Sequence, residues 1–233
     1  MTEWLEQAPP RTVARIAGIL YLLDILTSLL GDSLAGRTRV VPGNAAATAA
    51  SIIAHQPLLR LGVAANLFAT ACYAAVTVLF YALFKVVNKS LAWLVMVTSL
   101  AALAIWTSGT LAELAATLIL PGGHTSGPRA GQQALMLLEW NAHAFNLGLA
   151  VFGADCLLIG YLIVKSTFQP RVLGTLMMLG GIGLLTYPSP LLARDLYPYN
   201  AAPALVAETS LMLWLLVKGV NVQQRKQWAS AAR

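Results

Sequence analysis

Long apolar stretches that contain almost no charged residues constrain the fold of this chain more than any other feature. Six such stretches occur, at residues 13–30, 58–84, 91–120, 135–164, 172–187 and 204–220. A helix of about 20 apolar residues crosses the hydrocarbon core of a bilayer. The third and fourth stretches are long enough to tilt or to project, whereas the fifth is short. The sequence therefore predicts an all-α polytopic membrane protein with six transmembrane helices in a single transmembrane domain over residues 1–233.

Composition and charge support a membrane environment. Hydrophobic residues make up 58% of the chain and charged residues only 10%, whereas roughly a quarter of the residues in a soluble domain are charged. The formal net charge is +6, but the Lys and Arg residues are scattered in short loops and at both chain ends. This distribution favours anionic lipid headgroups over nucleic acid. The lipid bilayer is therefore the expected partner.

Basic residues also orient the predicted helices. With the amino terminus in the cytoplasm, ten Lys and Arg residues lie on the cytoplasmic side and five on the outer side. This ratio agrees with the positive-inside rule, and the opposite topology would violate it. We therefore expect three hairpins that open outward, with both termini cytoplasmic, in the cell membrane.

The outer connections contain signals for short helices. Asn44 follows Pro42-Gly43 and can cap the helix "AAATAASIIAH", which would lie at the outer interface rather than span the bilayer. We expect short interfacial helices in the outer loops, and tight turns on the cytoplasmic side. The fifth stretch, "LGTLMMLGGIGLL", is rich in glycine, which permits close approach of neighbouring helices.

Three acids in three different stretches share one depth. Counted from the basic residue at each cytoplasmic end, at about 1.5 Å of rise per residue, Asp24 lies about 14 Å deep, and Asp155 and Glu208 about 15 Å deep. Ionisable residues at this depth are costly and are therefore functional candidates. No Lys or Arg shares their level, so three ionised carboxylates would repel one another. If the three helices face one another, this arrangement suits the handling of a proton or a cation.

A second group of polar residues lies near the outer boundary. It consists of Asn66, Glu113, Glu139, His143 and Asn146, with Arg60 as the natural ion-pair partner of Glu113 or Glu139. At about 100° per residue, Glu139, His143 and Asn146 share one face of the fourth stretch, and Asp155 lies about 160° around that helix from Glu139. The outer group and Asp155 therefore cannot form one site on this helix.

Motifs for soluble-type chemistry are absent from the sequence. It contains no GxSxG, no HExxH, no Walker glycine loop and no GxGxxG that opens a helix. His55, His124 and His143 belong to the outer side and could form a metal site with Glu139, but the favoured reading includes no metal and no cofactor. Cys72 and Cys156 lie inside apolar runs without metal-ligand spacing and are expected to be buried apolar residues.

The chain resembles the bacterial membrane family catalogued as domain of unknown function 4386. The resemblance rests on four segments in order along the chain: "ARIAGILYLL", "VPGNAAATAASIIAHQPLLRLG", "FGADCLLIGYLIVKSTFQPRVLGTLMMLGG" and "ETSLMLWLLVKGV". It implies a polytopic helical bundle and brings no established activity, so no catalytic residue carries over. At the position of Asp155 the family commonly has His, and both residue types can carry a proton.

Three functional hypotheses remain open at this stage. The favoured one is a protein without enzymatic activity that binds or passes a small solute, cation or proton through a polar interior containing Asp24, Asp155 and Glu208. The first alternative is an intramembrane enzyme that uses Glu113, Glu139 and His143 on a lipid-like substrate at the outer face. The second is a structural or regulatory bundle in which these side chains form hydrogen bonds between helices.

Overall fold

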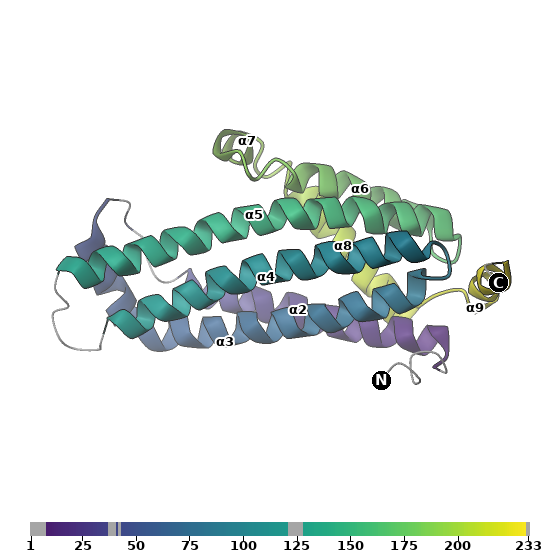
Figure 1. Ribbon diagram of the computed structural model, residues 1–233, viewed down its shortest axis with the longest axis horizontal. Coiled ribbons are helices and arrows are strands. Elements are labelled where there is room, and N and C mark those ends of the chain that lie inside the picture. The colour runs from purple at the N-terminus through teal and green to yellow at the C-terminus, as the bar shows by residue number, and fades with distance from the viewer. Residues whose placement is uncertain (1–7, 37–40, 42, 121–127, 232–233) are drawn as a thin grey trace. The chain divides into compact units, whose positions relative to one another are not determined.

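The computed structural model describes residues 8–36, 41, 43–120 and 128–231, and every regular element in these ranges is helical. Four long helices come first: α2 (Pro10–Ala35), α3 (Ala45–Phe84), α4 (Lys89–Ile119) and α5 (Pro128–Ser166). They are followed by α6 (Arg171–Leu184), α7 (Pro190–Asp195), α8 (Ala202–Val217) and α9 (Val222–Ala231) (Figure 1). The long helices α2 to α5 are each apolar and long enough to cross a membrane. The all-helical, membrane-type fold predicted from the sequence is confirmed at this level.

The backbone forms two compact units. The first comprises Met1–Leu22, Cys72–Ala102 and Leu147–Arg233, and the second comprises Leu23–Ala71 and Leu103–Asn146. Each of the four long helices contributes residues to both units, whereas α6 to α9 belong to the first alone. The polar residues of interest are described below unit by unit.

Helix α3 differs from the sequence-based expectation. We expected a separate interfacial helix over residues 45–55, but it is continuous with the following helix, which gives 40 helical residues with a kink at His55 (φ −117°, ψ 15°). Pro57 lies inside this helix and lacks the N–H group of an ordinary helical residue, which explains a bend without a break. The expected cap is present, because Asn44 Oδ1 accepts a hydrogen bond from the main-chain N–H of Ala47 at 3.0 Å.

Helices α6 and α8 are shorter than the others and pack against each other. Glycine allows α6 to lie very close to α5: a Cβ atom at Gly160 would lie 2.5 Å from the main-chain oxygen of Gly174, and the reverse distance is also 2.5 Å. A Cβ atom at Gly180 would lie 2.6 Å from Cα of Ala204 in α8. The glycine-rich stretch therefore brings both neighbouring backbones into close contact, as expected.

Hydrogen bonds connect helix α9 to the C-terminal end of α3 in the first unit. The guanidinium group of Arg225 donates hydrogen bonds to the main-chain oxygens of Ala82 (2.8 Å) and Leu83 (3.3 Å). These oxygens lie in the last turn of α3, where helical carbonyl groups lack internal partners and a cation is favourable. Burial lowers the pKa of Arg225 from its usual value, and arginine remains charged at physiological pH.

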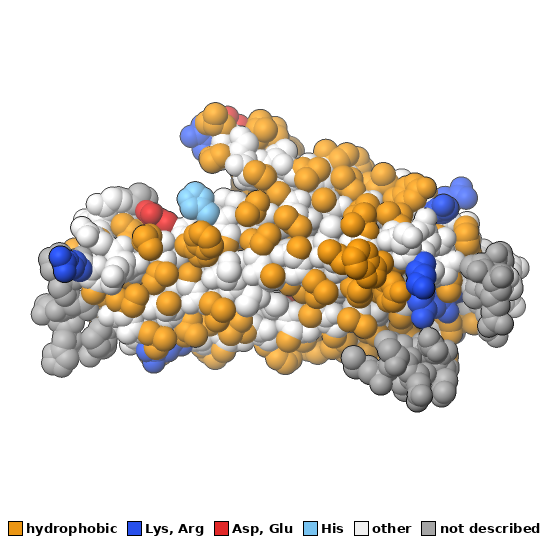
Figure 2. Space-filling model, viewed as in Figure 1, with side chains coloured by type: hydrophobic (Ala, Val, Ile, Leu, Met, Phe, Trp, Pro, Cys, Tyr) orange, Lys and Arg blue, Asp and Glu red, His pale blue; other side chains and the backbone are white. Residues whose placement is uncertain are grey.

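Apolar side chains cover much of the exposed surface. Exposed large residues occur on all the long helices, for example Leu26, Phe68, Trp93 and Tyr161. On the face shown in Figure 2, apolar side chains predominate and charged side chains are few. Both cysteines are buried, as expected. A surface of this kind fits a lipid environment rather than water.

Candidate functional site

Asp155 is a fully buried polar centre of the first unit. Asp155 is 0% exposed, and both of its carboxyl oxygens accept hydrogen bonds from hydroxyl groups on α4. The hydroxyl of Thr98 donates to Oδ1 and that of Ser99 donates to Oδ2, each at 2.7 Å. A buried carboxyl group is costly unless hydrogen bonds satisfy it, and here two neighbouring residues of α4 supply both bonds. The sequence singled out Asp155 but not its two partners.

Glu208 lies in the same unit as Asp155. It is half-buried on α8, and the thiol of the fully buried Cys156 experiences the electrostatic influence of both Glu208 and Asp155. Two of the three acids that share a depth in the sequence are thus brought to one neighbourhood. Asp24 is half-buried on the part of α2 that belongs to the second unit. Its convergence with the other two stays a prediction.

An aromatic chain adjoins Asp155 in the first unit. Phe152, one helical turn before Asp155, makes an edge-to-face contact with Tyr73 at a centroid distance of 5.6 Å. Tyr73 in turn contacts Tyr21 at 5.4 Å. All three residues are at most 5% exposed. They connect α5, α3 and α2 through edge-to-face contacts that begin one helical turn from Asp155.

In the second unit, Asn66 forms a polar contact between α3 and α2. Its side-chain N–H group donates to Oδ1 of Asp32 at 3.2 Å. The contact depends on Gly31, because a Cβ atom at that position would collide with the Asn66 side chain. Asn66 was predicted from the sequence as an outer-layer residue, whereas its partner, Asp32, was not.

Glu113 forms a second polar contact, between α4 and α5. It is 5% exposed, and Asn141 donates a long hydrogen bond of 3.5 Å to its Oε2. Asp32 is close enough to act electrostatically on Glu113. The second unit thus brings two acids near one another, each with an asparagine on the adjacent helix. Asn141, like Asp32, was not predicted from the sequence.

Arg60 does not make the ion pair that its position suggested. Its Nε–H group donates to the hydroxyl of Thr117 at 3.3 Å, and in the described residues no ion pair joins it to Glu113 or Glu139. Gln56, one turn earlier in α3, donates to the main-chain oxygen of Thr117 at 2.6 Å. Arg60 therefore belongs to a contact between α3 and the end of α4 rather than to either acid.

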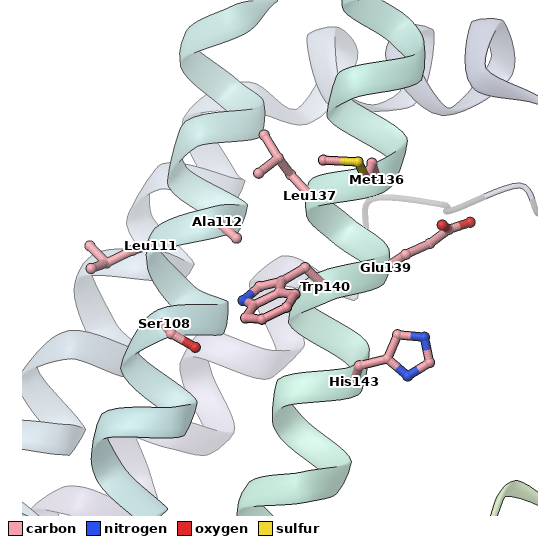
Figure 3. Close-up of a pocket in the computed structure, with 8 residues that line it drawn as sticks. All are labelled: Ser108, Leu111, Ala112, Met136, Leu137, Glu139, Trp140 and His143. Carbon is pink, nitrogen blue, oxygen red and sulfur yellow. The ribbon is translucent and has the colours of Figure 1, made fainter.

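A groove between α4 and α5 contains the remaining outer residues (Figure 3). Its volume is about 570 Å³, and its lining residues are Ser108, Leu111, Ala112, Met136, Leu137, Glu139, Trp140 and His143. Figure 3 shows the indole of Trp140 between the two helices, whereas Glu139 and His143 point to the other side of α5, one turn apart. Asn146 lies half-buried further along α5 and does not line this groove.

Among the described residues, no hydrogen bond or ion pair joins Glu113 to Glu139 or His143. Glu113 is buried against Asn141, whereas Glu139 and His143 are exposed. No group of three potential metal ligands occurs in the parts of the chain that the structure describes. His55 bonds to the main-chain oxygen of Ser51 at 3.0 Å, and His124 lies outside the described residues.

Comparison with protein families identifies the chain. The family model described as "Domain of unknown function (DUF4386)" matches residues 16–219. This protein belongs to that family. The match includes Asp24, Asp155 and Glu208 and all of α3 to α8, in agreement with the resemblance seen in the sequence. No curated protein and no solved structure matches the chain.

Proposed function

We propose that this protein is a six-span protein of the bacterial inner membrane, with three hairpins and both termini cytoplasmic, whose interior binds and passes a proton at Asp155. The membrane orientation is supported by the ten-to-five distribution of basic residues. Helices α6 and α8 complete the set of six, and Arg171 and Lys218 flank their expected cytoplasmic ends. Of the small solute, the cation and the proton that the sequence suggested, the proton is the simplest.

The observation that carries the proposal is the double hydroxyl contact of a fully buried carboxyl group. The two oxygen-to-oxygen distances of 2.7 Å are those of direct hydrogen bonds. A metal cation would require both hydroxyl groups to turn their protons away from the carboxylate and to present lone pairs instead. A proton can be exchanged within the existing hydrogen bonds, which supports a proton over a larger cation.

Thr98 allows Asp155 to gain and lose a proton without loss of a hydrogen bond. Its hydroxyl oxygen lies 2.7 Å from Asp155 Oδ1 and 3.0 Å from the main-chain oxygens of both Leu94 and Val95. A hydroxyl group has one proton to donate and can also accept. It donates to an ionised Asp155, and it accepts from a protonated Asp155 while it donates to the main chain. Both protonation states are therefore satisfied.

Glu208 is the second acid of the proposed route. It is near enough to act electrostatically on the thiol of Cys156, the residue that follows Asp155. It lies on α8, whereas Asp155 lies on α5 and its hydroxyl partners lie on α4. Acidic residues on different helices at membrane depth are typical of proton relays. Asp24 is proposed as a third member because it shares their calculated depth.

Proton flux into proteoliposomes tests the proposal. An internal pH-sensitive dye reports acidification after a potassium diffusion potential is imposed. We expect Asp155→Asn to lower the flux about tenfold or more and Glu208→Gln to lower it less, because asparagine keeps the hydrogen bonds but cannot exchange a proton. Asp195→Asn, which removes an exposed carboxylate from α7, is the control. Equal flux in the wild type and in the combined Asp24, Asp155 and Glu208 amide variant would end the proposal.

A further inference from the structure

We infer that α7 and the two tyrosines that follow it are immersed in the outer leaflet of the bilayer, with the leucines among the lipid chains and Arg194 and Asp195 at the headgroups. The partner of this surface is lipid. The inference rests on the proposed six-span orientation but not on proton transfer. Three features support it: the exposure of α7, the separation of its apolar and charged faces, and the shortness of its neighbours α6 and α8.

The helix α7 does not pack into the protein. None of its residues is buried. The large apolar side chains of α7 and of the turn after it are all exposed: Leu191, Leu192, Leu196, Tyr197 and Tyr199. Figure 1 shows α7 at the edge of the molecule, and mainly apolar side chains cover it in Figure 2. An exposed apolar patch of this kind marks a contact with a protein or a membrane, and the next two features select the membrane.

Apolar and charged residues lie on different faces of α7. At about 100° per residue, Leu192 and Leu196 lie about 40° apart, and Arg194 lies about 160° from both. Leu196 caps the helix and keeps a helical backbone (φ −93°, ψ −7°). Arg194 pairs with Asp195 at 3.0 Å, and both side chains are exposed. A helix with this division lies in the membrane interface, where tyrosine is also enriched.

The lengths of α6 and α8 place α7 at the outer border of the hydrocarbon. With Arg171 and Lys218 at the cytoplasmic surface, the two helices reach about 21 and 24 Å into the bilayer. The hydrocarbon core is about 30 Å thick, so about 6–9 Å of it remain beyond their outer ends. A helix with its side chains is about 10–12 Å in diameter, so one layer of helix occupies this depth. The exposed Ile182 and Leu185 continue the apolar surface from α6 toward α7.

Hydrogen bonds connect α7 to the end of α6 and satisfy part of its backbone. Asn200 is 3% exposed, and its Nδ2 donates to the hydroxyl of Thr186 at 3.1 Å and to the main-chain oxygen of Ala193 at 3.2 Å. An unpaired backbone group is costly in hydrocarbon. Main-chain N–H groups that donate within the segment belong to Ala193, Leu196, Tyr197 and Asn200. Pro190 and Pro198 have no N–H group, so the segment presents few unpaired donors to lipid.

Electron paramagnetic resonance of the full-length protein in lipid nanodiscs tests the inference. A nitroxide is attached to Leu192→Cys or, as the matched control on the opposite face, to Arg194→Cys, and collisions with oxygen and with a water-soluble nickel chelate are measured. The native cysteines are buried, and Leu179→Cys on the exposed surface of α6 calibrates the hydrocarbon. We expect the oxygen-to-nickel ratio to be at least about threefold higher for Leu192→Cys than for Arg194→Cys, because the apolar face of an interfacial helix is buried about 5–10 Å into the boundary between headgroups and acyl chains.

Two results would overturn the inference. Equal access of the nickel chelate to both labels would show that α7 lies in water. Low access of both reagents to the label at Leu192→Cys, with an immobilised spectrum, would show that a protein surface, such as a second copy of the chain, covers this face. The six-span orientation fails by a different observation, the modification of Asp195→Cys only from the cytoplasmic side, and the proposed proton transfer fails by unchanged flux. The three failures are therefore distinguishable.

Discussion

At the scale of single residues, the hydroxyl groups beside Asp155 provide a direct test of its environment. We expect Ser99→Ala to lower the free energy of unfolding by about 1–3 kcal/mol, because it leaves one oxygen of a fully buried carboxyl group without a donor. Thr98→Val should cost less, since Thr98 is only half-buried. Unfolding in mixed micelles of increasing SDS content measures both changes.

A threonine elsewhere in the first unit provides the matched control. Thr175 on α6 is exposed, and its hydroxyl donates to the main-chain oxygen of Val172 in its own helix. Thr175→Val should therefore change stability by no more than about 0.5 kcal/mol. A Ser99→Ala variant as stable as this control would contradict the hydrogen-bonded description of Asp155.

The sequence revealed the acids of the site but not their partners, for a physical reason. An acid inside an apolar run is conspicuous because few residues are so costly there. Serine and threonine are common in membrane helices, where they bond to their own backbone, so Thr98 and Ser99 carry no comparable signal. Their role follows from the register of α4 against α5, which only tertiary packing determines. Asp32 and Asn141 escaped notice similarly.

At the scale of helices, the close contact between α5 and α6 depends on two facing glycines. Gly160→Ala or Gly174→Ala would place a Cβ atom 2.5 Å from a main-chain oxygen of the other helix. Because backbone cannot yield as a flexible side chain does, we expect a loss of about 1–3 kcal/mol in the free energy of unfolding. The same unfolding assay in mixed micelles measures it.

Gly131 is a suitable comparison for these two glycines. A Cβ atom there would lie 3.2 Å from the main-chain oxygen of Ala45, so a shift of a few tenths of an ångström relieves the contact. Gly131→Ala should cost clearly less than Gly160→Ala. If the two variants are equally stable, the short approach of α5 to α6 does not contribute to the fold as described.

Helix positions followed well from the sequence, whereas helix boundaries did not. The apolar runs predicted every long helix, because the cost of exposed backbone in lipid leaves a spanning segment little alternative. Helix α5 begins at Pro128, whereas the apolar stretch was expected to begin at residue 135. Proline fits the first turn of a helix, so the helix can begin there. The helix over residues 45–55 and the apolar stretch from residue 58 were expected to be separate, but Pro57 lies inside α3, close to the kink at His55.

At the scale of the whole molecule, the number of spans depends on α6 and α8. At about 1.5 Å per residue, their 14 and 16 residues extend about 21 and 24 Å, less than the roughly 30 Å of a hydrocarbon core. A six-span arrangement requires local thinning of the bilayer or the use of flanking residues. The alternative is a hairpin that enters and leaves on the cytoplasmic side.

Cysteine labelling of intact cells distinguishes these arrangements. Asp195→Cys lies between α6 and α8, and Lys165→Cys lies in the last turn of α5. A membrane-impermeant maleimide should modify Asp195→Cys in intact cells, and Lys165→Cys only after permeabilisation. The native Cys72 and Cys156 are 6% and 1% exposed and should give little background. If Asp195→Cys also requires permeabilisation, α6 and α8 do not span the membrane, and Glu208 approaches Asp155 from a hairpin within the bilayer.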